Sequence, residues 1–266
     1  MGISRSDALL NSHLKLISGT VRRSENGLKI DDREADMEII AHIESAYDEK
    51  FGIPRQSGLA ASSRERIIFE KPYRQIEAVR GLEGYSHLWI LWLFSEVADE
   101  RKKKTDVHAF CATVRPPRLG GNERMGVFAT RSPFRPNHIG LSCVQLCAVD
   151  LNGPEAPVLI VSGGDMLNGT PVIDIKPYLP YTDAHPEASD GFSDRSTNVL
   201  SVSFPPDLLS RIPNEKRQAL YEALALDPRP AYQDDPERVY GMLFAGMNIR
   251  FTVAGKLLSV ISVDPA

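Results

Sequence analysis

Seven short β-rich runs between residues 38 and 175 constrain the fold more than any other feature of this sequence. They are Glu38–Ser45, Arg66–Glu70, His87–Val97, Val107–Val114, Leu141–Leu151, Pro157–Ser162 and Val172–Ile175. Stretches rich in Gly and Pro separate the runs, and no long amphipathic helix lies between them. A doubly wound nucleotide-binding fold needs such helices between its strands. The pattern therefore predicts a mainly β fold, a single antiparallel or mixed β-barrel, in which the apolar run at residues 87–97 is a strand buried on both faces.

The pattern changes on both sides of this barrel region, which we expect to span residues 37–180. Residues 1–36 are polar and irregular and predict an N-terminal extension of low order. Residues 181–199 are rich in Asp, Ser, Thr and Pro and predict a linker. We expect a small C-terminal α+β domain over 200–266, with an amphipathic helix at Asp207–Leu226 and Asn214 as its N-cap. Three short strands follow in this interpretation, at Val239–Phe244, Asn248–Val253 and Leu257–Val263.

Composition and charge exclude several classes of protein. The 266 residues carry a formal net charge of -4, which excludes a generally basic nucleic-acid binder, and we expect no DNA partner. No apolar run approaches the roughly 20 residues that span a bilayer, so we expect no membrane partner. The first twenty residues lack the apolar core of a secretory signal, although a weak organelle-targeting role stays open. Three cysteines are too few for a disulfide framework, and these features together favour the cytoplasm.

Arginines are concentrated in one segment. Residues 111–140 hold five arginines against one acid, Glu123, a local charge of +4 in a chain that is acidic overall. The arginines are Arg115, Arg118, Arg124, Arg131 and Arg135. An arginine-dense segment in an acidic protein is typical of an anion-binding site.

Three loops are dense in Arg, Pro, Gly and Asn. They are Phe51–Gly58, Arg115–Ser142 and Leu167–Tyr178. Proline restricts the backbone and glycine allows close approach of a ligand, so such loops hold their polar groups in a preset cradle. The alternative is that they are tight barrel corners whose arginines pair with nearby acids.

The motifs in these loops resemble those of the TsaA-like family, the TrmO type of tRNA (adenine-N6)-methyltransferase. The matching segments include F-G-I-P-R-Q, G-L-E-G-Y-S-H-L-W, T-V-R-P-P-R-L-G-G-N, G-V-F-A-T-R-S-P-F-R-P-N-H-I-G-L-S and N-G-T-P-V-I-D-I-K-P-Y. The match runs from about Glu38 to Tyr178 and continues weakly at D-P-R-P-A-Y and R-V-Y-G in the C-terminal region.

The resemblance implies a β-barrel that binds S-adenosylmethionine and a homodimer with the cofactor near the subunit interface. It implies methylation of N6 of the threonylcarbamoylated adenosine on the 3′ side of the anticodon, tRNA position 37, in threonine tRNA. The family's cofactor contacts match Pro54, Arg55, Gln56, His87, Leu88, Arg131, Leu141, Leu167, Asn168, Gly169 and Thr170.

Two positions depart from the family pattern. His138 stands where the family usually has Pro, and Asn168 where it usually has Asp. The second change removes a charge that is able to pair with the cofactor's amine or sulfonium, so we expect it to affect cofactor affinity.

Other roles are less specific. The catalytic group is not located by sequence. Asp227 and Asp174 are weak candidates for a proton acceptor, and capping or salt-bridge roles are the favoured alternative for both. The candidates for tRNA contacts are Arg118, Arg124, Arg135, Arg229 and Tyr232. Cys143 and Cys147 are four residues apart, but with one further cysteine we expect no zinc site.

Two other functions remain compatible with these residues. One is an S-adenosylmethionine-binding sensor or an RNA-binding module without catalysis. The reason to consider it is Asn168, where the family usually has Asp. The other is a methyltransferase that acts on a substrate other than tRNA.

Overall fold

A computed structural model describes residues 22–24, 27–29, 37–95, 110–116, 123–192, 199–229, 233 and 235–266. The chain divides into two compact units, Met1–Glu38 and Ile39–Ala266. In the first unit, β1 (Arg22–Ser24) and β2 (Gly27–Lys29) form an antiparallel pair, which the sequence pattern did not predict. In the described part of the chain, no helix is long and apolar enough to cross a membrane.

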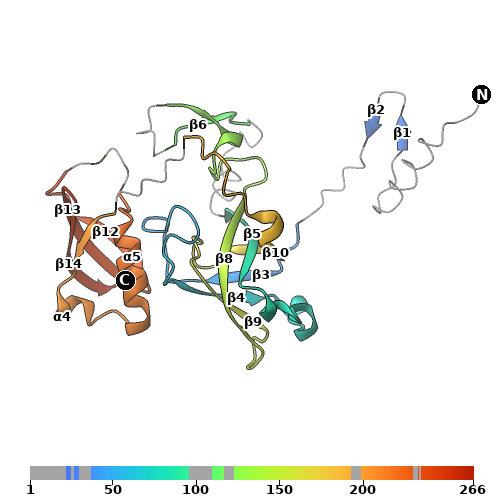
Figure 1. Ribbon diagram of the computed structural model, residues 1–266. Coiled ribbons are helices and arrows are strands. Elements are labelled where there is room, and N and C mark those ends of the chain that lie inside the picture. The colour runs from blue at the N-terminus through green and yellow to red at the C-terminus, as the bar shows by residue number, and fades with distance from the viewer. Residues whose placement is uncertain are drawn as a thin grey trace, which may run out of the picture. The chain divides into compact units, whose positions relative to one another are not determined.

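The second unit contains a closed six-stranded barrel (Figure 1). Its strands are β3 (Ala41–Glu44), β4 (Arg64–Phe69), β5 (His87–Leu93), β8 (Ile139–Asp150), β9 (Val158–Ser162) and β10 (Pro171–Pro177). The order around the barrel is β10-β3-β4-β9-β8-β5, and each neighbouring pair is antiparallel. The predicted fold class, a mainly β barrel, is therefore confirmed, and the barrel is antiparallel throughout.

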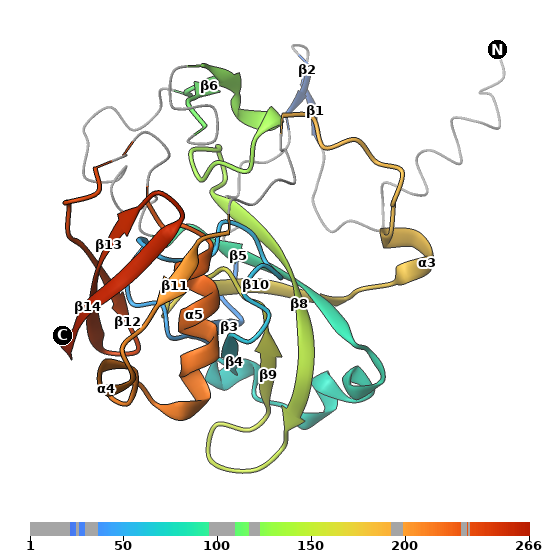
Figure 2. The same cartoon turned by 60° about the vertical axis from the view of Figure 1, so that its left-hand side comes forward.

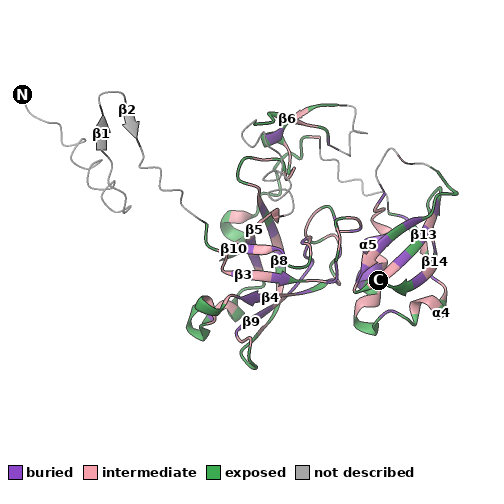
Figure 3. Ribbon diagram, turned by 180° about the vertical axis from the view of Figure 1, so that it is seen from behind, coloured by how far each residue is buried: buried purple, intermediate pink, exposed green. Residues whose placement is uncertain are grey.

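Strand β5 shows how side chains divide between the core and the outer face. Leu88 and Ile90 are fully buried and Trp92 nearly so, whereas the residues between them are half-buried. The prediction of burial on both faces is wrong, because the outer face is covered only in part, at Trp89 by the Tyr178 ring. Buried residues (purple) line the barrel strands in Figure 3. Each large apolar side chain buried there contributes on the order of 1.5–3 kcal/mol.

The arginine-dense segment forms little regular structure. Of the predicted strand Val107–Val114, only β6 (Thr113–Val114) is formed among the described residues, and it pairs with β7 (Met125–Gly126). Residues 107–109 lie outside the described residues. The segment then makes a turn, the 3-10 helix η6 (Val127–Ala129), and enters β8. Its prolines and glycines disfavour longer strand pairing.

The C-terminal part forms a four-stranded sheet in the order β11-β14-β13-β12. These strands are β11 (Ser201–Ser203), β12 (Tyr240–Phe244), β13 (Met247–Ala254) and β14 (Leu257–Pro265). The three predicted strands are present, whereas β11, which pairs in parallel with β14, was not predicted. Helix α5 (Arg217–Ala225) packs its buried face into the core of this sheet (Figure 2).

The predicted helix at Asp207–Leu226 is not continuous. It is divided into α4 (Pro206–Leu209), the 3-10 turn η7 (Asn214–Lys216) and α5. Pro213 explains the break, because proline cannot supply the N–H of a helix interior. The prediction that Asn214 caps the helix is also wrong, since Lys216 is the N-cap of α5 and Asn214 starts the preceding 3-10 turn.

The connection between β3 and β4 joins the barrel to the C-terminal sheet. Tyr47 is 1% exposed in the core of that sheet, and it pairs with Phe244 in an isolated β-bridge. The Phe51 ring stacks on Tyr240 and Phe251, with centroids 6.5 and 6.3 Å away. The loop that follows Phe51 is therefore held at its start by the C-terminal sheet. The domain limits 37–180, 181–199 and 200–266 stay a prediction, as does the low order of residues 1–36, most of which lie outside the described residues.

Candidate functional site

A cavity of about 770 Å³ opens where four segments of the second unit meet. They are the connection between β3 and β4, the end of β5, the turn that leads into β8, and the connection between β9 and β10. The volume lies in the range of about 300–1,000 Å³ that is usual for small-molecule and cofactor sites. The three loops dense in Arg, Pro, Gly and Asn all contribute to the cavity. Residues 53–56 come from the first loop, residues between 130 and 141 from the second, and Leu167 and Thr170 from the third.

The walls combine apolar surface with concentrated positive charge. The apolar lining comes from Ile53, Pro54, Trp92, Leu93, Phe94, Pro133, Phe134, Ile139, Leu141 and Leu167. The charged side chains among the described lining residues are Lys50, Arg55, Arg131 and Arg135, with one carboxylate, Asp165. Such a site suits a flat, largely apolar ligand that also carries an anionic group.

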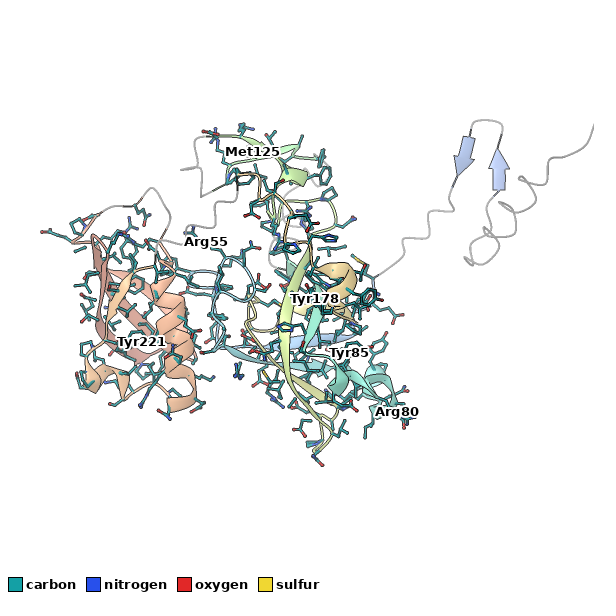
Figure 4. The ribbon with its side chains drawn as sticks, viewed as in Figure 1. Arg55, Arg80, Tyr85, Met125, Tyr178 and Tyr221 are labelled. Atoms are coloured by element: carbon teal, nitrogen blue, oxygen red, sulfur yellow. The ribbon has the colours of Figure 1, made fainter. Side chains whose placement is uncertain are left out.

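Hydrogen bonds hold the arginines of the cavity in place. Arg131 Nη1 donates to Gln56 Oε1 and so joins two of the loops. Arg135 Nη1 donates to the Thr130 carbonyl at 3.0 Å and closes the turn between them. Arg55, labelled in Figure 4, donates from Nη2 to the Arg229 carbonyl at 3.1 Å. The guanidinium groups are therefore partly preorganised before any ligand binds.

A directed chain of hydrogen bonds leads from the barrel core to Asp165. Trp92 Nε1 donates to Ser142 Oγ at 2.9 Å, and Ser142 Oγ donates to Asp165 Oδ1 at 2.5 Å. Burial raises the pKa of Asp165, and the Ser142 hydroxyl and the charge of Arg131 oppose that rise. Gly140 makes room for this arrangement, because a Cβ there would overlap the Trp92 ring.

The cavity brings together most of the residues that the resemblance implies as cofactor contacts. Those that line it are Pro54, Arg55, Gln56, Arg131, Leu141, Leu167 and Thr170. Four others are not among its lining residues: His87, Leu88, Asn168 and Gly169.

His87 and Leu88 lie at the opposite end of β5 from the cavity. Trp92 is five positions after His87, which is about 16 Å along an extended strand. The Leu88 side chain is fully buried in the barrel core. The His87 ring accepts or donates a hydrogen bond with Ser86 Oγ at 3.0 Å and faces the Tyr178 ring.

Asn168 and Gly169 connect the end of β3 to the C-terminal sheet. The exposed Asn168 side chain accepts from the Ser45 N–H at 3.2 Å and donates to Asp48 Oδ1 at 3.4 Å. Asp48 Oδ2 in turn accepts from the Gly246 N–H at 3.0 Å. An Asp at position 168 would place two carboxylates side by side here. Asn in place of the family's usual Asp at position 168 therefore avoids this repulsion with Asp48.

His138, the other departure, occupies the tight turn before β8. Its φ is 51°, in the left-handed region, and its Nδ1 lies 2.9 Å from the Pro133 carbonyl oxygen. Proline, which the family usually has at this position, is restricted to φ near about −65°. The turn therefore has a local backbone conformation that proline cannot adopt.

Both weak candidates for a proton acceptor lie outside the cavity lining and are held in ion pairs. Asp174 Oδ2 lies 2.9 Å from Lys176 Nζ. Asp227 pairs with Arg229 through two hydrogen bonds of 2.9 Å. These geometries favour the salt-bridge alternative for both carboxylates. Sequence reasoning missed Asp165, although a carboxylate directly after Gly163–Gly164 at the end of a buried strand was a signal for it.

The candidates for tRNA contacts differ in exposure. Arg124 is exposed on the β6–β7 pair, and Arg135 lines the cavity. Arg229 is 8% exposed and is occupied by Asp227. Arg118 and Tyr232 lie outside the described residues. Across the described chain, no group of three or more His, Cys, Asp or Glu is placed to hold a metal ion.

Comparison with known proteins identifies both parts of the chain. Residues 42–184 match the model of the tRNA-methyltransferase O N-terminal domain, and residues 197–266 match the TrmO C-terminal domain. The tRNA (adenine(37)-N6)-methyltransferase of Escherichia coli is 41% identical over 237 residues, which cover 86% of this chain and 97% of that protein.

Two Pseudomonas aeruginosa proteins agree with this. One, provisionally described as the S-adenosylmethionine-dependent methyltransferase RcsF, is 40% identical over 220 residues, 80% of this chain and 90% of its own. The crystal structure of TrmO from that organism aligns with a TM-score of 0.68 and 33% identity, covering 90% of this chain and 100% of the TrmO chain. The chain belongs to the tRNA-methyltransferase O family.

Proposed function

We propose that this protein is an S-adenosylmethionine-dependent tRNA methyltransferase that methylates N6 of adenosine 37. We infer further that its substrate is threonine tRNA whose adenosine 37 already carries the threonylcarbamoyl group. The observation that carries the proposal is the cavity, where the stiff, arginine-rich loops of this family meet. The names of the relatives support the reaction and its position, because the E. coli protein is a tRNA (adenine(37)-N6)-methyltransferase.

The lining of the cavity fits the cofactor. Bound there, S-adenosylmethionine supplies the methyl group on a positively charged sulfur. Arg131, which donates a hydrogen bond to Gln56, is our candidate for binding the cofactor's carboxylate. The apolar wall that includes Leu141 and Leu167 suits its adenine ring.

The charge of the cavity supports the threonylcarbamoylated substrate. The cofactor has one carboxylate, whereas four cationic side chains line the cavity among the described residues. The threonyl part of the modified adenosine brings a second carboxylate, which the surplus positive charge suits. The arginine-dense segment contributes Arg131 and Arg135 to this charge, and exposed Arg124 is our candidate for a phosphate contact.

We propose that the protein acts as a homodimer. The resemblance implies His87 and Leu88 as cofactor contacts, yet they lie away from the cavity of their own chain. A second copy whose β5 end approaches the cavity would bring His87 and the backbone beside it to the cofactor, whereas the Leu88 side chain stays in its own barrel core. Light scattering tests this, and a mass of 29.5 kDa at every concentration would contradict it.

The reaction is tested by transfer of a labelled methyl group from S-adenosylmethionine to two tRNA samples. One is threonine tRNA purified with its natural modifications, and the other is the same tRNA transcribed without them. We expect label on N6 of the threonylcarbamoylated adenosine in the first sample and none in the second. Equal labelling of both samples would contradict the need for prior modification.

The same experiment tests the two alternatives. Cofactor binding without transfer to either tRNA sample would support a sensor or a substrate other than tRNA, and label on tRNA would contradict both alternatives. The motive for the sensor was the lost charge at Asn168, which contacts Ser45 and Asp48 outside the cavity lining. We place the reaction in the cytoplasm, where the three free thiols, Cys111, Cys143 and Cys147, are stable.

A further inference from the structure

Asp165 is the single carboxylate among the described residues that line the cavity. It is not among the cofactor contacts that the resemblance implies, so its place in the site needs another explanation. Methylation of an exocyclic nitrogen forms an N–C bond and breaks the methyl–sulfur bond, whose electron pair stays on sulfur. The nitrogen also loses one proton, and a proton acceptor near it lowers the barrier.

The hydrogen bonds that lead to Asp165 run from Trp92 through Ser142 to the carboxylate. An indole N–H is a donor and never an acceptor, so Ser142 Oγ accepts from Trp92 and has its own proton left to give. That proton goes to Asp165 Oδ1, 2.5 Å away. Ser142 is fully buried and Trp92 is 7% exposed, so water does not compete for these bonds. Asp165 therefore receives a hydrogen bond that favours its ionised form.

The groups around Asp165 shift the pKa of its carboxyl in opposite directions. Burial raises the pKa of its carboxyl, while Ser142 and the positive charge of Arg131 act against that rise. Lys50, Arg55 and Arg135 line the same cavity. On the other side, the buried carboxyl of Glu65 interacts with it electrostatically. Asp165 is thus a stronger base than an exposed aspartate.

We propose that the Asp165 carboxylate accepts the proton that the adenosine nitrogen loses during methyl transfer. This inference rests on the proposed function. In the step, the nitrogen keeps the electron pair of its N–H bond, and the proton forms a new O–H bond on Asp165. Ser142 and Trp92 are positioning residues in this scheme, because they act through Asp165.

The variants Asp165→Asn and Asp183→Asn test the proposal. Asp183 is the control, because it too accepts a side-chain hydrogen bond, from the Trp89 indole N–H at 2.9 Å, but lies outside the cavity lining. The measurements are cofactor affinity by calorimetry, single-turnover methyl transfer between about pH 5 and about pH 9, and a carbon-NMR titration of the Asp165 carboxyl.

We expect Asp165→Asn to bind the cofactor within about threefold of the wild type and to transfer the methyl group roughly 100- to 10,000-fold more slowly. Its rate should lose the acid limb of the pH profile, whose midpoint in the wild type should match the NMR titration of Asp165. Asp183→Asn should keep the rate and the profile. Ser142→Ala should move the acid limb to higher pH, because it removes a hydrogen bond that lowers the Asp165 pKa.

Two results would overturn the proposal. One is an Asp165→Asn rate within about fivefold of the wild type with the acid limb intact. The other is a loss of cofactor affinity large enough to account for the whole loss of rate, which would make Asp165 a cofactor ligand. If the wild type itself transfers no methyl group to tRNA, the proposed function fails first and the role of Asp165 fails with it.

Discussion

Glu65 makes the stability of the barrel depend on pH in a direction that is unusual for a carboxylate. It lies on β4, is 1% exposed, and accepts hydrogen bonds from Ser63 Oγ and from the Gly164 N–H. Burial raises its pKa from 4.5 to about 6, although both hydrogen bonds act to lower it. Gly164 is needed here, since a Cβ would lie 2.8 Å from the Glu65 carboxyl carbon.

The size and sign of the effect follow from this shift. A rise of about 1.5 pKa units corresponds to ~2 kcal/mol. The native state holds the proton more tightly than the unfolded state, so this stabilisation is fully present below about pH 4.5 and is lost as the pH rises through about 6. The buried carboxylate therefore lowers the free energy of unfolding at neutral pH.

Glu65→Gln should remove this dependence. A glutamine amide is neutral at every pH, and its oxygen can accept the Gly164 N–H while its NH₂ donates to Ser63 Oγ. We expect the variant to be more stable than the wild type by about 2 kcal/mol near pH 8, and equally stable below about pH 4.5.

Urea unfolding followed by tryptophan fluorescence measures this difference. Both tryptophans, Trp89 and Trp92, lie on β5, so the signal reports on the barrel. Other carboxylates also titrate in this range, and the informative quantity is the difference between the two proteins at each pH. A difference that is the same at all pH values, or a variant less stable than the wild type near about pH 8, would refute the reasoning.

Three further variants test the site and its surroundings. Arg131→Ala should weaken cofactor binding by about 1.5–3 kcal/mol in calorimetry, because it removes a charged hydrogen-bond donor, and an unchanged Kd would exclude that role. Asn168→Asp should lower the melting temperature through repulsion from Asp48, at a cost of up to about 1 kcal/mol, and a lost cofactor affinity instead would return this position to the site. Phe128 is 69% exposed and stacks on the half-exposed Phe110 at 5.8 Å, so Phe128→Ala should weaken tRNA binding by about 1–3 kcal/mol in filter binding while leaving cofactor affinity unchanged. Unaltered tRNA binding would mean that no base stacks there.

Local patterns were sufficient for the barrel strands but not for two features of the C-terminal sheet. Alternation and turn residues predict β4, β9 and β12–β14 because each is bounded by Gly or Pro and faces a core on one side. β11 has three residues and exists because β14 pairs with it in parallel, which no local pattern reveals. The interruption before α5 follows from Pro213, because proline lacks the N–H that a helix interior needs.

Site residues that lie in the family motifs were predictable from the sequence. Site residues whose role depends on contacts between distant segments were not. Arg131 and Gln56 come from two quoted motifs and meet across the cavity. The hydrogen bonds that position the Asp165 carboxylate come from Ser142 and, through it, from Trp92. These residues are 23 and 73 positions away in the sequence. A single sequence does not reveal such a network: Gly163–Gly164 is a local signal for Asp165, but nothing near it in the sequence indicates contact with Ser142 or Trp92.

The C-terminal sheet contributes to the cavity through the loop that it holds. Lys50 and residues 53–56 line the cavity, and the residues just before them are fixed in the C-terminal part. The Leu243 N–H donates to Glu49 Oε1 at 2.6 Å, and the Gly246 N–H donates to Asp48. On the far side of the loop, Glu222 of α5 accepts from the N–H and the hydroxyl of Ser62 at 2.8 and 2.7 Å. The loop that presents Arg55 and Gln56 is thus anchored at both ends to the C-terminal part. Loss of that sheet would release the loop and weaken the cavity even though none of its strands lines it.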